Sequence, residues 1–258
     1  MFTHPQFDPV ALSIGPLSVH WYGLMYVAAF FTGLWLGKYR ARQPGSGWTE
    51  EQVDDFLVYL VLGVILGGRI GYVLFYGWEY WMQDFTYILR IWQGGMSFHG
   101  GLLGVIGALW WFGRKYKKPF LVTADFVAPL FPAGLMFGRI GNFINEELWG
   151  RVTDVPWGMI FPSVDNLPRH PSPLYQAFGE GFLLFVLVWA FSSKKRPPGA
   201  VAGMFLIGYA VFRSTAEFFR VPDAQLGFLA LDFLTMGMLL SIPMALLGLF
   251  LIGNAYRK

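Results

Sequence analysis

Seven long apolar runs dominate the pattern of hydrophobic and polar positions, and short polar or Gly- and Pro-containing segments separate them. A helix of roughly 20 apolar residues crosses the ~30 Å hydrocarbon core of a bilayer. Because lipid offers no partner for backbone polar groups, such a run must be helical. The ~10-residue alternating segments of a membrane β-barrel are not seen. The predicted spans are residues 17–37, 54–76, 97–113, 121–142, 173–192, 200–219 and 232–252.

The fold class predicted from these runs is an all-α integral membrane protein, with residues 1–258 as a single polytopic domain of about seven transmembrane helices. Its composition agrees, because 55% of the residues are hydrophobic and only 14% are charged, against about 25% charged in soluble domains. The third run is short and rich in glycine, which suggests a broken or re-entrant start near Gly94 and Gly95. The chain has no cysteine, which excludes disulfides and thiolate metal sites. No cleavable signal peptide is expected.

Basic residues predict the orientation of the helices. The loops that follow the odd-numbered spans hold all seven lysines, whereas the alternate loops hold four arginines, Arg90, Arg151, Arg169 and Arg220. The positive-inside rule places the lysine-bearing loops in the cytoplasm, so the N-terminus lies outside and the C-terminus lies in the cytoplasm. The lysine-bearing set consists of Lys38, Arg40, Arg42, Arg114, Lys115, Lys117, Lys118, Lys194, Lys195, Arg196, Arg257 and Lys258.

Two segments are then expected on the outer, periplasmic side, about 77–96 and 143–172. The second is rich in Pro, Asp, Asn and Arg and predicts a small periplasmic cap. Within the first, residues 78–95 are dense in aromatic side chains, which is typical of an amphipathic segment lying among lipid headgroups.

Three arginines lie inside predicted spans: Arg69, Arg139 and Arg213. A buried arginine costs roughly 3 kcal/mol or more and usually marks function. Each is near the outer end of a span that runs from inside to outside, so the three lie at a similar depth. They could converge on one anion, and the planar guanidinium fork suits phosphate. The alternative is that each extends separately to the headgroups or pairs with a nearby carboxylate.

Helical spacing groups further polar residues with these arginines. Arg139, Asn142 and Asn145 or Glu146 share one face at the outer end of span four. A second polar face in span six carries Tyr209, Arg213, Glu217 and Arg220. Polar residues on one face of an apolar helix point into the protein or a wet cavity. The simpler interpretation of Arg213 and Glu217 is an intrahelical ion pair.

His99 lies between glycines at the start of span three, where a ligand or another backbone can approach closely. Its imidazole can exchange a proton near neutral pH, although a packing role is about equally plausible. Gly67, Gly68 and Gly71, like Gly138 and Gly141, are best explained by close helix packing. GRIG occurs at 68–71 and again at 138–141, which is weak evidence for a repeat. No G-x-S-x-G, Walker or metal-ligand motif is present.

Six blocks of sequence together resemble the prolipoprotein diacylglyceryl transferase family over nearly the whole chain. The longest and most specific is GRIGNFINEELWGR at 138–151. The others are HWYGLMY (20–26), GGRIGYVLFY (67–76), GGMSFHGGLLG (94–104), RHPSPLYQ (169–176) and GYAVFRSTAEFFRVPDAQ (208–225). The external segment between Gly150 and Arg169 looks shorter than in some members.

The resemblance implies a multi-pass enzyme of the bacterial inner membrane whose site faces the periplasm. Its donor would be phosphatidylglycerol, and its acceptor the lipobox cysteine of a prelipoprotein signal peptide. The products would be a thioether-linked diacylglyceryl prelipoprotein and glycerol phosphate. The family's functional residues fall on Tyr22, His99, Arg139, Asn142, Glu147, Gly150, Tyr209, Arg213 and Glu217.

We expect His99, Arg213, Tyr209 and Tyr22 to be catalytic. The residues expected to bind phosphatidylglycerol are Arg139, Asn142, Asn145, Glu147, Gly150, Arg69 and Glu217. A thiol must ionise before it attacks carbon, and its free pKa is near 8.5. The departing phosphate ester needs cations, which Arg139 and Arg213 can supply. No cofactor, metal or nucleic acid is expected.

Two alternatives remain open on the residues alone. A transporter or flippase for an anionic lipid would use the same arginines but would need polar groups in the inner halves of the spans, where Asp54, Asp55 and Asp125 lie near the cytoplasmic ends. A non-catalytic membrane scaffold would leave the buried arginines and His99 unexplained.

Overall fold

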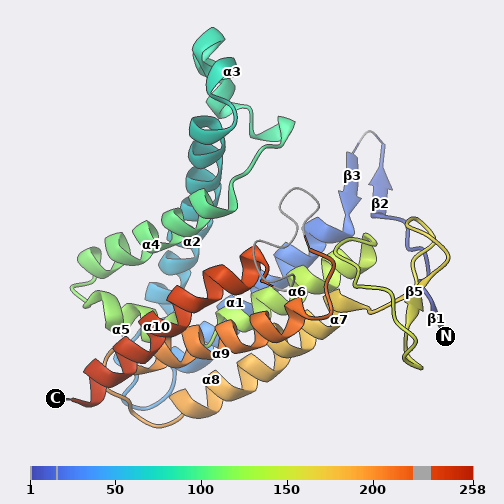
Figure 1. The fold of residues 1–258 in the computed structure, drawn as a ribbon. Helices are drawn as coiled ribbons and strands as arrows, with labels where there is room; N and C mark the ends of the chain where they lie inside the picture. The colour runs from blue at the N-terminus through green and yellow to red at the C-terminus, as the bar shows by residue number, and fades with distance from the viewer. Residues whose placement is uncertain (1, 16, 223–233, 258) are drawn as a thin grey trace. The chain divides into compact units, whose positions relative to one another are not determined.

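The computed structural model describes residues 2–15, 17–222 and 234–257 (Figure 1). The described chain is mostly helical and divides into two compact units. The first comprises residues 1–36 and 125–258, and the second comprises residues 37–124.

A helix overlaps each of the seven predicted spans. Three of them, residues 50–75, 172–192 and 236–256, are long and apolar enough to cross a membrane, and a bent helix pair over 120–144 makes a fourth candidate. That all seven cross the bilayer stays a prediction. The helices at these positions begin with α1 (Trp21–Ala41), α2 (Glu50–Phe75), α4 (Phe98–Lys115), α5 (Phe120–Val127) and α6 (Phe131–Ile144). They go on with α7 (Ser172–Gln176), which continues into α8 (Leu184–Ser192), and end with α9 (Ala200–Glu217) and α10 (Met236–Tyr256).

Several predicted boundaries were wrong. The first helix begins at Trp21, because residues 17–20 form a strand. The fourth span is bent by 50° between α5 and α6, where Pro132 stands in the first turn of α6. Proline cannot continue a helix because it lacks a backbone N–H and clashes with the preceding turn. Residues 232 and 233 of the last predicted span lie outside the described residues.

The prediction of an all-α fold was also wrong in detail, because the first unit contains short strands. β2 (Val10–Ile14) and β3 (Leu17–His20) form an antiparallel hairpin. β1 (Phe2–Thr3) pairs in parallel with β4 (Met159–Ile160), which pairs antiparallel with β5 (Pro168–Arg169). The predicted cap at 143–172 therefore includes a small sheet that incorporates the beginning of the chain.

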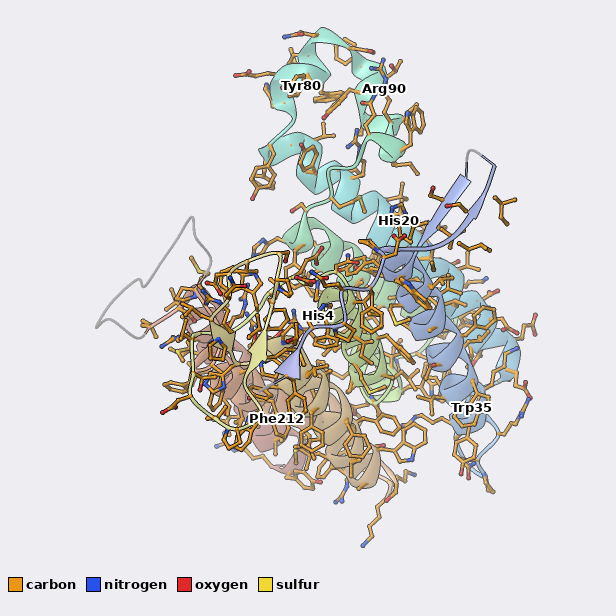
Figure 2. All side chains as sticks on the ribbon, turned by 90° about the vertical axis from the view of Figure 1, so that its right-hand side faces the viewer. His4, His20, Trp35, Tyr80, Arg90 and Phe212 are labelled. Atoms are coloured by element: carbon orange, nitrogen blue, oxygen red, sulfur yellow. The ribbon has the colours of Figure 1, made fainter. Side chains whose placement is uncertain are left out.

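His4 fastens this sheet to the end of α6. Its ring is almost fully buried (Figure 2); Nε2 lies 2.9 Å from the carbonyl oxygen of Phe143, and Nδ1 lies 3.0 Å from Oε1 of Glu146. Glu146 accepts further hydrogen bonds from the backbone and hydroxyl of Ser163. Burial opposes ionisation of Glu146, but Ser163 and His4 outweigh it and hold the pKa of Glu146 below its usual value. An ionised Glu146 thus joins three parts of the cap.

Glycines form the contact between α2 and α4 in the second unit. A Cβ atom on Gly63 would lie 2.6 Å from the carbonyl oxygen of Gly104, and one on Gly71 would lie 2.7 Å from the Cα of Gly100. Gly67 faces the backbones of Gly100 and Gly104 equally closely. Only glycine permits helix backbones to come this near. The packing role predicted for Gly67 and Gly71 is confirmed.

Arg69 lies within this glycine contact, toward the C-terminal end of α2, and is 2% exposed. Its guanidinium donates to the carbonyl oxygens of Ile88 (3.1 Å) and Tyr87 (2.5 Å) and to those of Gly94 and Gly95 at 2.7 and 3.3 Å. It therefore fastens the segment between α2 and α4, which contains α3 (Trp78–Gln83) and two short 3₁₀ turns, η1 (Phe85–Leu89) and η2 (Ile91–Gln93). Gly94 and Gly95 lie in this loop at positive φ, and α4 starts only at Phe98, with Ser97 as its N-cap.

Candidate active site

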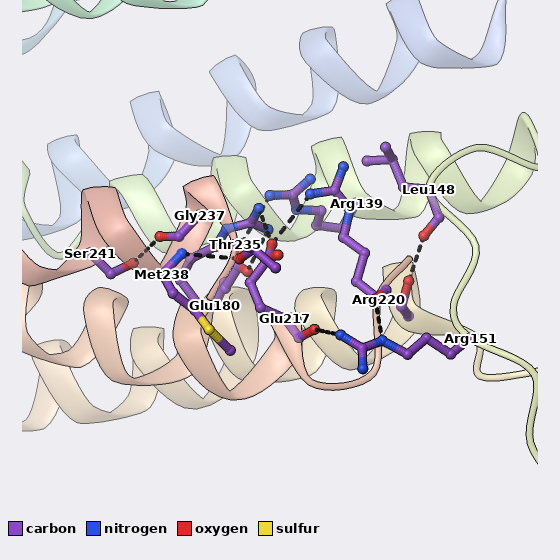
Figure 3. Close-up of polar contacts among 12 residues, drawn as sticks. Arg139, Leu148, Arg151, Glu180, Glu217, Arg220, Thr235, Gly237, Met238 and Ser241 are labelled. Atoms are coloured by element: carbon purple, nitrogen blue, oxygen red, sulfur yellow. Dashed lines mark hydrogen bonds and ion pairs between the residues drawn. The ribbon is translucent and has the colours of Figure 1, made fainter. Parts of the chain in front are cut away.

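Two arginines of the first unit converge on one buried carboxylate, Glu180. Nη2 of Arg139 on α6 donates to Oε2 of Glu180 at 3.1 Å (Figure 3). Nη1 of Arg213 on α9 lies 3.5 Å from Oε1 of Glu180. Glu180 is 0% exposed. A carboxylate at this depth is tolerated only when it is paired, because desolvation of a charge is costly. Of the three arginines expected to converge on one anion, Arg139 and Arg213 converge on a carboxylate of the chain itself, whereas Arg69 donates to backbone oxygens.

Glu180 belongs to a π-helical stretch, η3 (Ala177–Leu183), between α7 and α8. π-turns are rare, and they occur frequently at functional sites. Gly181 beside it allows close contact with α6, since a Cβ there would lie 2.5 Å from the Cβ of Met136. The irregular turn and the small residue together bring the carboxylate between α6 and α9.

The ion pairs continue along α9 through Glu217, which is 1% exposed. Its carboxylate pairs with Arg213 one turn before it, and Oε1 accepts from Nη1 of Arg220 at 3.3 Å. The intrahelical pair of Arg213 and Glu217 is therefore confirmed. Gly237 of α10 packs against it, because a Cβ there would lie 2.8 Å from Oε1 of Glu217. Arg151 donates to the backbone oxygens of Arg220 and Glu217, at 2.9 and 3.3 Å.

Three guanidinium groups and two carboxylates form this cluster in the described part of the chain: Arg139, Arg213 and Arg220 face Glu180 and Glu217 through the four ion pairs above. Oε1 of Glu180 and Nη1 of Arg213 have no hydrogen-bond partner there. Arg213 therefore keeps a guanidinium N–H from which an anion can accept.

Glu147 accepts hydrogen bonds from the two predicted amides at the end of α6. Its Oε2 accepts from Nδ2 of Asn142 at 2.8 Å, and its Oε1 accepts from Nδ2 of Asn145 at 3.2 Å. The backbone reverses here, with Glu146 and Leu148 at positive φ. Asn142, Asn145 and Glu147 thus form one hydrogen-bonded group that begins about one helical turn after Arg139, and the lipid-binding role expected of these residues stays a prediction.

The other predicted residues of the first unit lie around these two groups. Gly150 lies between two other backbone segments. A Cβ atom on Gly150 would lie 2.6 Å from the carbonyl oxygen of Phe219. The ring of Tyr22 packs on Gly141 of α6, since a Cβ there would lie 2.8 Å from Cδ2 of Tyr22. Tyr209, one turn before Arg213, packs against the apolar core around Leu184.

Arg69 and His99 belong to the second unit. His99 is exposed in the first turn of α4, with its ring against that of Phe98 at 5.7 Å between centroids. The lipid-binding role of Arg69 and the catalytic role of His99 stay predictions.

Sequence reasoning missed Glu180, which nevertheless carries a clear signal. It is a lone acid in an apolar helix that otherwise contains no charged side chain between residues 172 and 192. His4 was missed as well, because its partners are more than 130 residues away in the sequence. Among the described residues, no group of His, Asp and Glu is arranged to hold a metal ion.

Comparison with known proteins decides the family. The family model described as prolipoprotein diacylglyceryl transferase matches residues 9–253. This chain belongs to the prolipoprotein diacylglyceryl transferase family. It is 58% identical over 252 residues to a phosphatidylglycerol–prolipoprotein diacylglyceryl transferase of Nitratidesulfovibrio vulgaris strain DP4, covering 98% of this chain and 96% of that protein. Relatives with the same name in Cupriavidus necator and Legionella pneumophila strain Lens are each 56% identical, with coverage of 100% and 96%, and of 97% and 98%.

Membership of the transferase family confirms the resemblance drawn from the six sequence blocks. The matched region includes every residue predicted to form the site, from Tyr22 to Glu217. It also includes Glu180, Gln176 and the π-helical stretch.

Removal of the Glu180 carboxylate should destabilise this family member. In Glu180→Ala, Arg139 loses its carboxylate and Arg213 loses one of two, which should cost about 3–5 kcal/mol of unfolding free energy. Glu180→Gln should cost less, because an amide oxygen still accepts from Arg139. Thermal unfolding in detergent measures both variants. Glu51→Ala, which removes an exposed acid of α2, is the matched control; an equal melting temperature for Glu180→Ala and Glu51→Ala would contradict a structural ion pair.

Proposed function

We propose that this chain is a transferase that moves the diacylglyceryl group of phosphatidylglycerol onto the lipobox cysteine of prelipoproteins. The observation that carries the proposal is the ion-pair cluster around Arg139, Glu180 and Arg213, in which Nη1 of Arg213 has no hydrogen-bond partner among the described residues. Phosphatidylglycerol is a phosphodiester with one negative charge, and its phosphate oxygens can accept from such a donor. The relatives of Nitratidesulfovibrio and Cupriavidus bear the name of this activity.

The reaction balances with the groups at hand. The acceptor thiol gives up its proton, and sulfur attacks the carbon of the diacylglycerol moiety that is bonded to a phosphate oxygen. The carbon–oxygen bond breaks, a thioether forms, and glycerol phosphate leaves with the bonding electrons. The phosphate gains negative charge as this bond breaks, so Arg139 and Arg213 stabilise the transition state more than the bound lipid. On the family resemblance alone we propose His99 as the general base and Tyr22 and Tyr209 as catalytic residues.

The proposed setting is the bacterial inner membrane, with seven spans, the N-terminus and the site on the periplasmic side, and the C-terminus in the cytoplasm. The lysine distribution supports this orientation. Apolar side chains exposed on the helices support lipid contact; Phe31 of α1 is 68% exposed and Phe250 of α10 is 66% exposed. The donor's acyl chains would stay in lipid while its headgroup enters between helices.

A lipid transporter is the less favoured alternative, because the acids that could line an inner path have structural partners. Asp125 accepts from the backbone N–H groups of Gly199 and Ala202 at 2.7 and 2.8 Å and caps α9. Asp54 pairs with Lys38 at 2.7 Å, and Asp55 pairs with Lys115 at 2.5 Å.

The direct test is thioether formation by the purified full-length protein, given phosphatidylglycerol and a peptide with a lipobox cysteine. Mass spectrometry should detect a diacylglyceryl peptide together with one glycerol phosphate for each peptide modified. Movement of fluorescent phosphatidylglycerol between leaflets without any peptide product would favour the transporter instead.

Arg139→Lys should lower the transfer rate by about 10²- to 10³-fold, the range for losing an oriented donor to a developing anion. Lysine keeps the charge beside Glu180 but loses the bidentate fork. Steady-state rates at saturating lipid measure the effect. Arg42→Lys, at an exposed pair with Glu50, controls for the exchange itself. A folded Arg139→Lys protein with normal activity would show that Arg139 serves only its ion pair.

His99→Gln should slow transfer by about 10²- to 10⁴-fold near neutral pH if His99 is the general base. The defect should shrink as pH rises from 6 to 9, because the acceptor thiol, with a free pKa near 8.5, ionises unaided. A defect of constant size across this range would contradict the base and leave His99 a structural role.

Added cysteines should report the topology, because the chain has none of its own. Asn166→Cys, at an exposed position of the cap, should react with an impermeant thiol reagent in intact spheroplasts. Lys117→Cys, at an exposed position after α4, should react only after lysis. The reverse labelling pattern would overturn the orientation and place the site away from its proposed substrates.

A further inference from the structure

Gln176 is a buried polar residue whose side-chain amide is unpaired in the described structure. Its side chain is 0% exposed, and neither its amide oxygen nor its amide nitrogen has a hydrogen-bond partner among the described residues. An unsatisfied buried polar group destabilises a fold, and the large majority of buried side-chain polar atoms are bonded. Because this unpaired amide destabilises the fold, we expect it to form hydrogen bonds with a ligand.

The position of Gln176 places it beside the ion-pair cluster. Ser172, Gln176 and Glu180 follow one another at intervals of four residues, so they share one face, and all three are 0% exposed. Ser172 donates to the carbonyl oxygen of Leu148, and Glu180 pairs with Arg139. Gln176 is the member of this row whose polar atoms are both unbonded in the described structure. It lies one helical turn from Glu180 on the side of the cap.

The helices on either side extend this arrangement. α7 packs against both α6 and α9. α6 and α9 run toward the cap, whereas α7 and α8 run away from it, so two layers are formed. The inner layer holds Arg139, Glu180 and Arg213. The outer layer, one turn nearer the cap, holds Asn142 on α6, Glu217 on α9 and Gln176 between these two helices.

We propose that Gln176 binds the hydroxyl groups of the headgroup glycerol of phosphatidylglycerol and thereby selects this lipid as donor. The inference rests on the proposed function. A lipid entering from the outer leaflet has its acyl chains toward the bilayer centre, its phosphate next and its headgroup glycerol nearest the water. With the phosphate at Arg139 and Arg213, the glycerol lies about one helical turn, or ~5.4 Å, nearer the cap, at the level of Gln176.

The chemistry of the amide matches a diol. Each hydroxyl both donates and accepts, and the side chain of Gln176 supplies one acceptor and a donor group. Oε1 of Glu180, which is also unbonded, is a second acceptor within reach of the same headgroup. An ethanolamine headgroup has an ammonium instead of hydroxyls, so it cannot accept from the amide.

Donor selectivity tests the proposal. Purified full-length enzyme would be assayed with phosphatidylglycerol and with phosphatidylpropanol, whose headgroup keeps the phosphate and three carbons but lacks both hydroxyls. Wild type should prefer phosphatidylglycerol by roughly tenfold or more in kcat/KM, because a site built for hydroxyls rejects analogues without them. In Gln176→Leu, and in Gln176→Met as a second variant, this ratio should fall to within about threefold, through loss of activity on phosphatidylglycerol.

Thermal unfolding without added lipid separates this role from a structural one. Gln176→Leu should unfold at the same temperature as wild type or a higher one, because an apolar side chain of similar size replaces an unpaired amide. Ser172→Ala, on the same buried face, should lower the melting temperature through loss of its bond to Leu148 but keep the donor ratio. A wild-type enzyme that uses both lipids equally would overturn the proposal, as would an unchanged ratio in both Gln176 variants. In either case transfer from phosphatidylglycerol by wild type would leave the proposed function standing.

Discussion

The attraction of Arg139 and Arg213 to the buried carboxylate of Glu180 is the interaction on which the first unit depends. Three helical segments supply these groups, and an apolar interior gives each charge a large desolvation cost when it is alone. The carboxylate makes two partly buried guanidinium groups tolerable. It does so with a contact that is incomplete on the side of Arg213, where the 3.5 Å pair is not a hydrogen bond. The same contact thus stabilises the first unit and leaves a donor of Arg213 for an anionic ligand.

Irregular backbone makes this arrangement possible. The π-helical stretch η3 carries Glu180, and the bend between α5 and α6 redirects the helix that carries Arg139. At the far end of α6, the reversal at Glu146 and Leu148 brings Glu147 back to Asn142. Straight, regular helices are sufficient to cross lipid. The candidate site, in contrast, lies where a helix bends, forms a π-turn or ends in a reversal. The unpaired amide of Gln176 lies in the short helix just before the π-helical stretch.

The sequence predicted the helices well, because apolar length and period are local properties. It also singled out Arg139, Asn142 and Arg213 as candidates, since an arginine in an apolar run stands out and neighbours three or four residues away share a face. Glu147 was named through the family resemblance alone. The short strands of the cap could not be predicted in this way: β1 pairs with β4 across more than 150 residues. Glu180 could have been found by the same argument as the arginines, applied to acids. The partners of Arg69 are backbone oxygens, which no pattern of side chains reveals.

The glycine contact between α2 and α4 has a genetic consequence. Every amino acid that a single base change can put in place of glycine carries a Cβ atom, and at Gly63, Gly67, Gly71, Gly100 and Gly104 that atom would lie against the backbone of the opposite helix. Conservative replacement is therefore impossible along this contact, even by alanine. Missense changes here would impair the packing of the helix pair without altering a residue of the ion-pair cluster, so they would lower the amount of folded enzyme. In a screen for loss of function, these five codons would appear as a periodic group of sensitive positions far from any titratable side chain of the ion-pair cluster in the sequence.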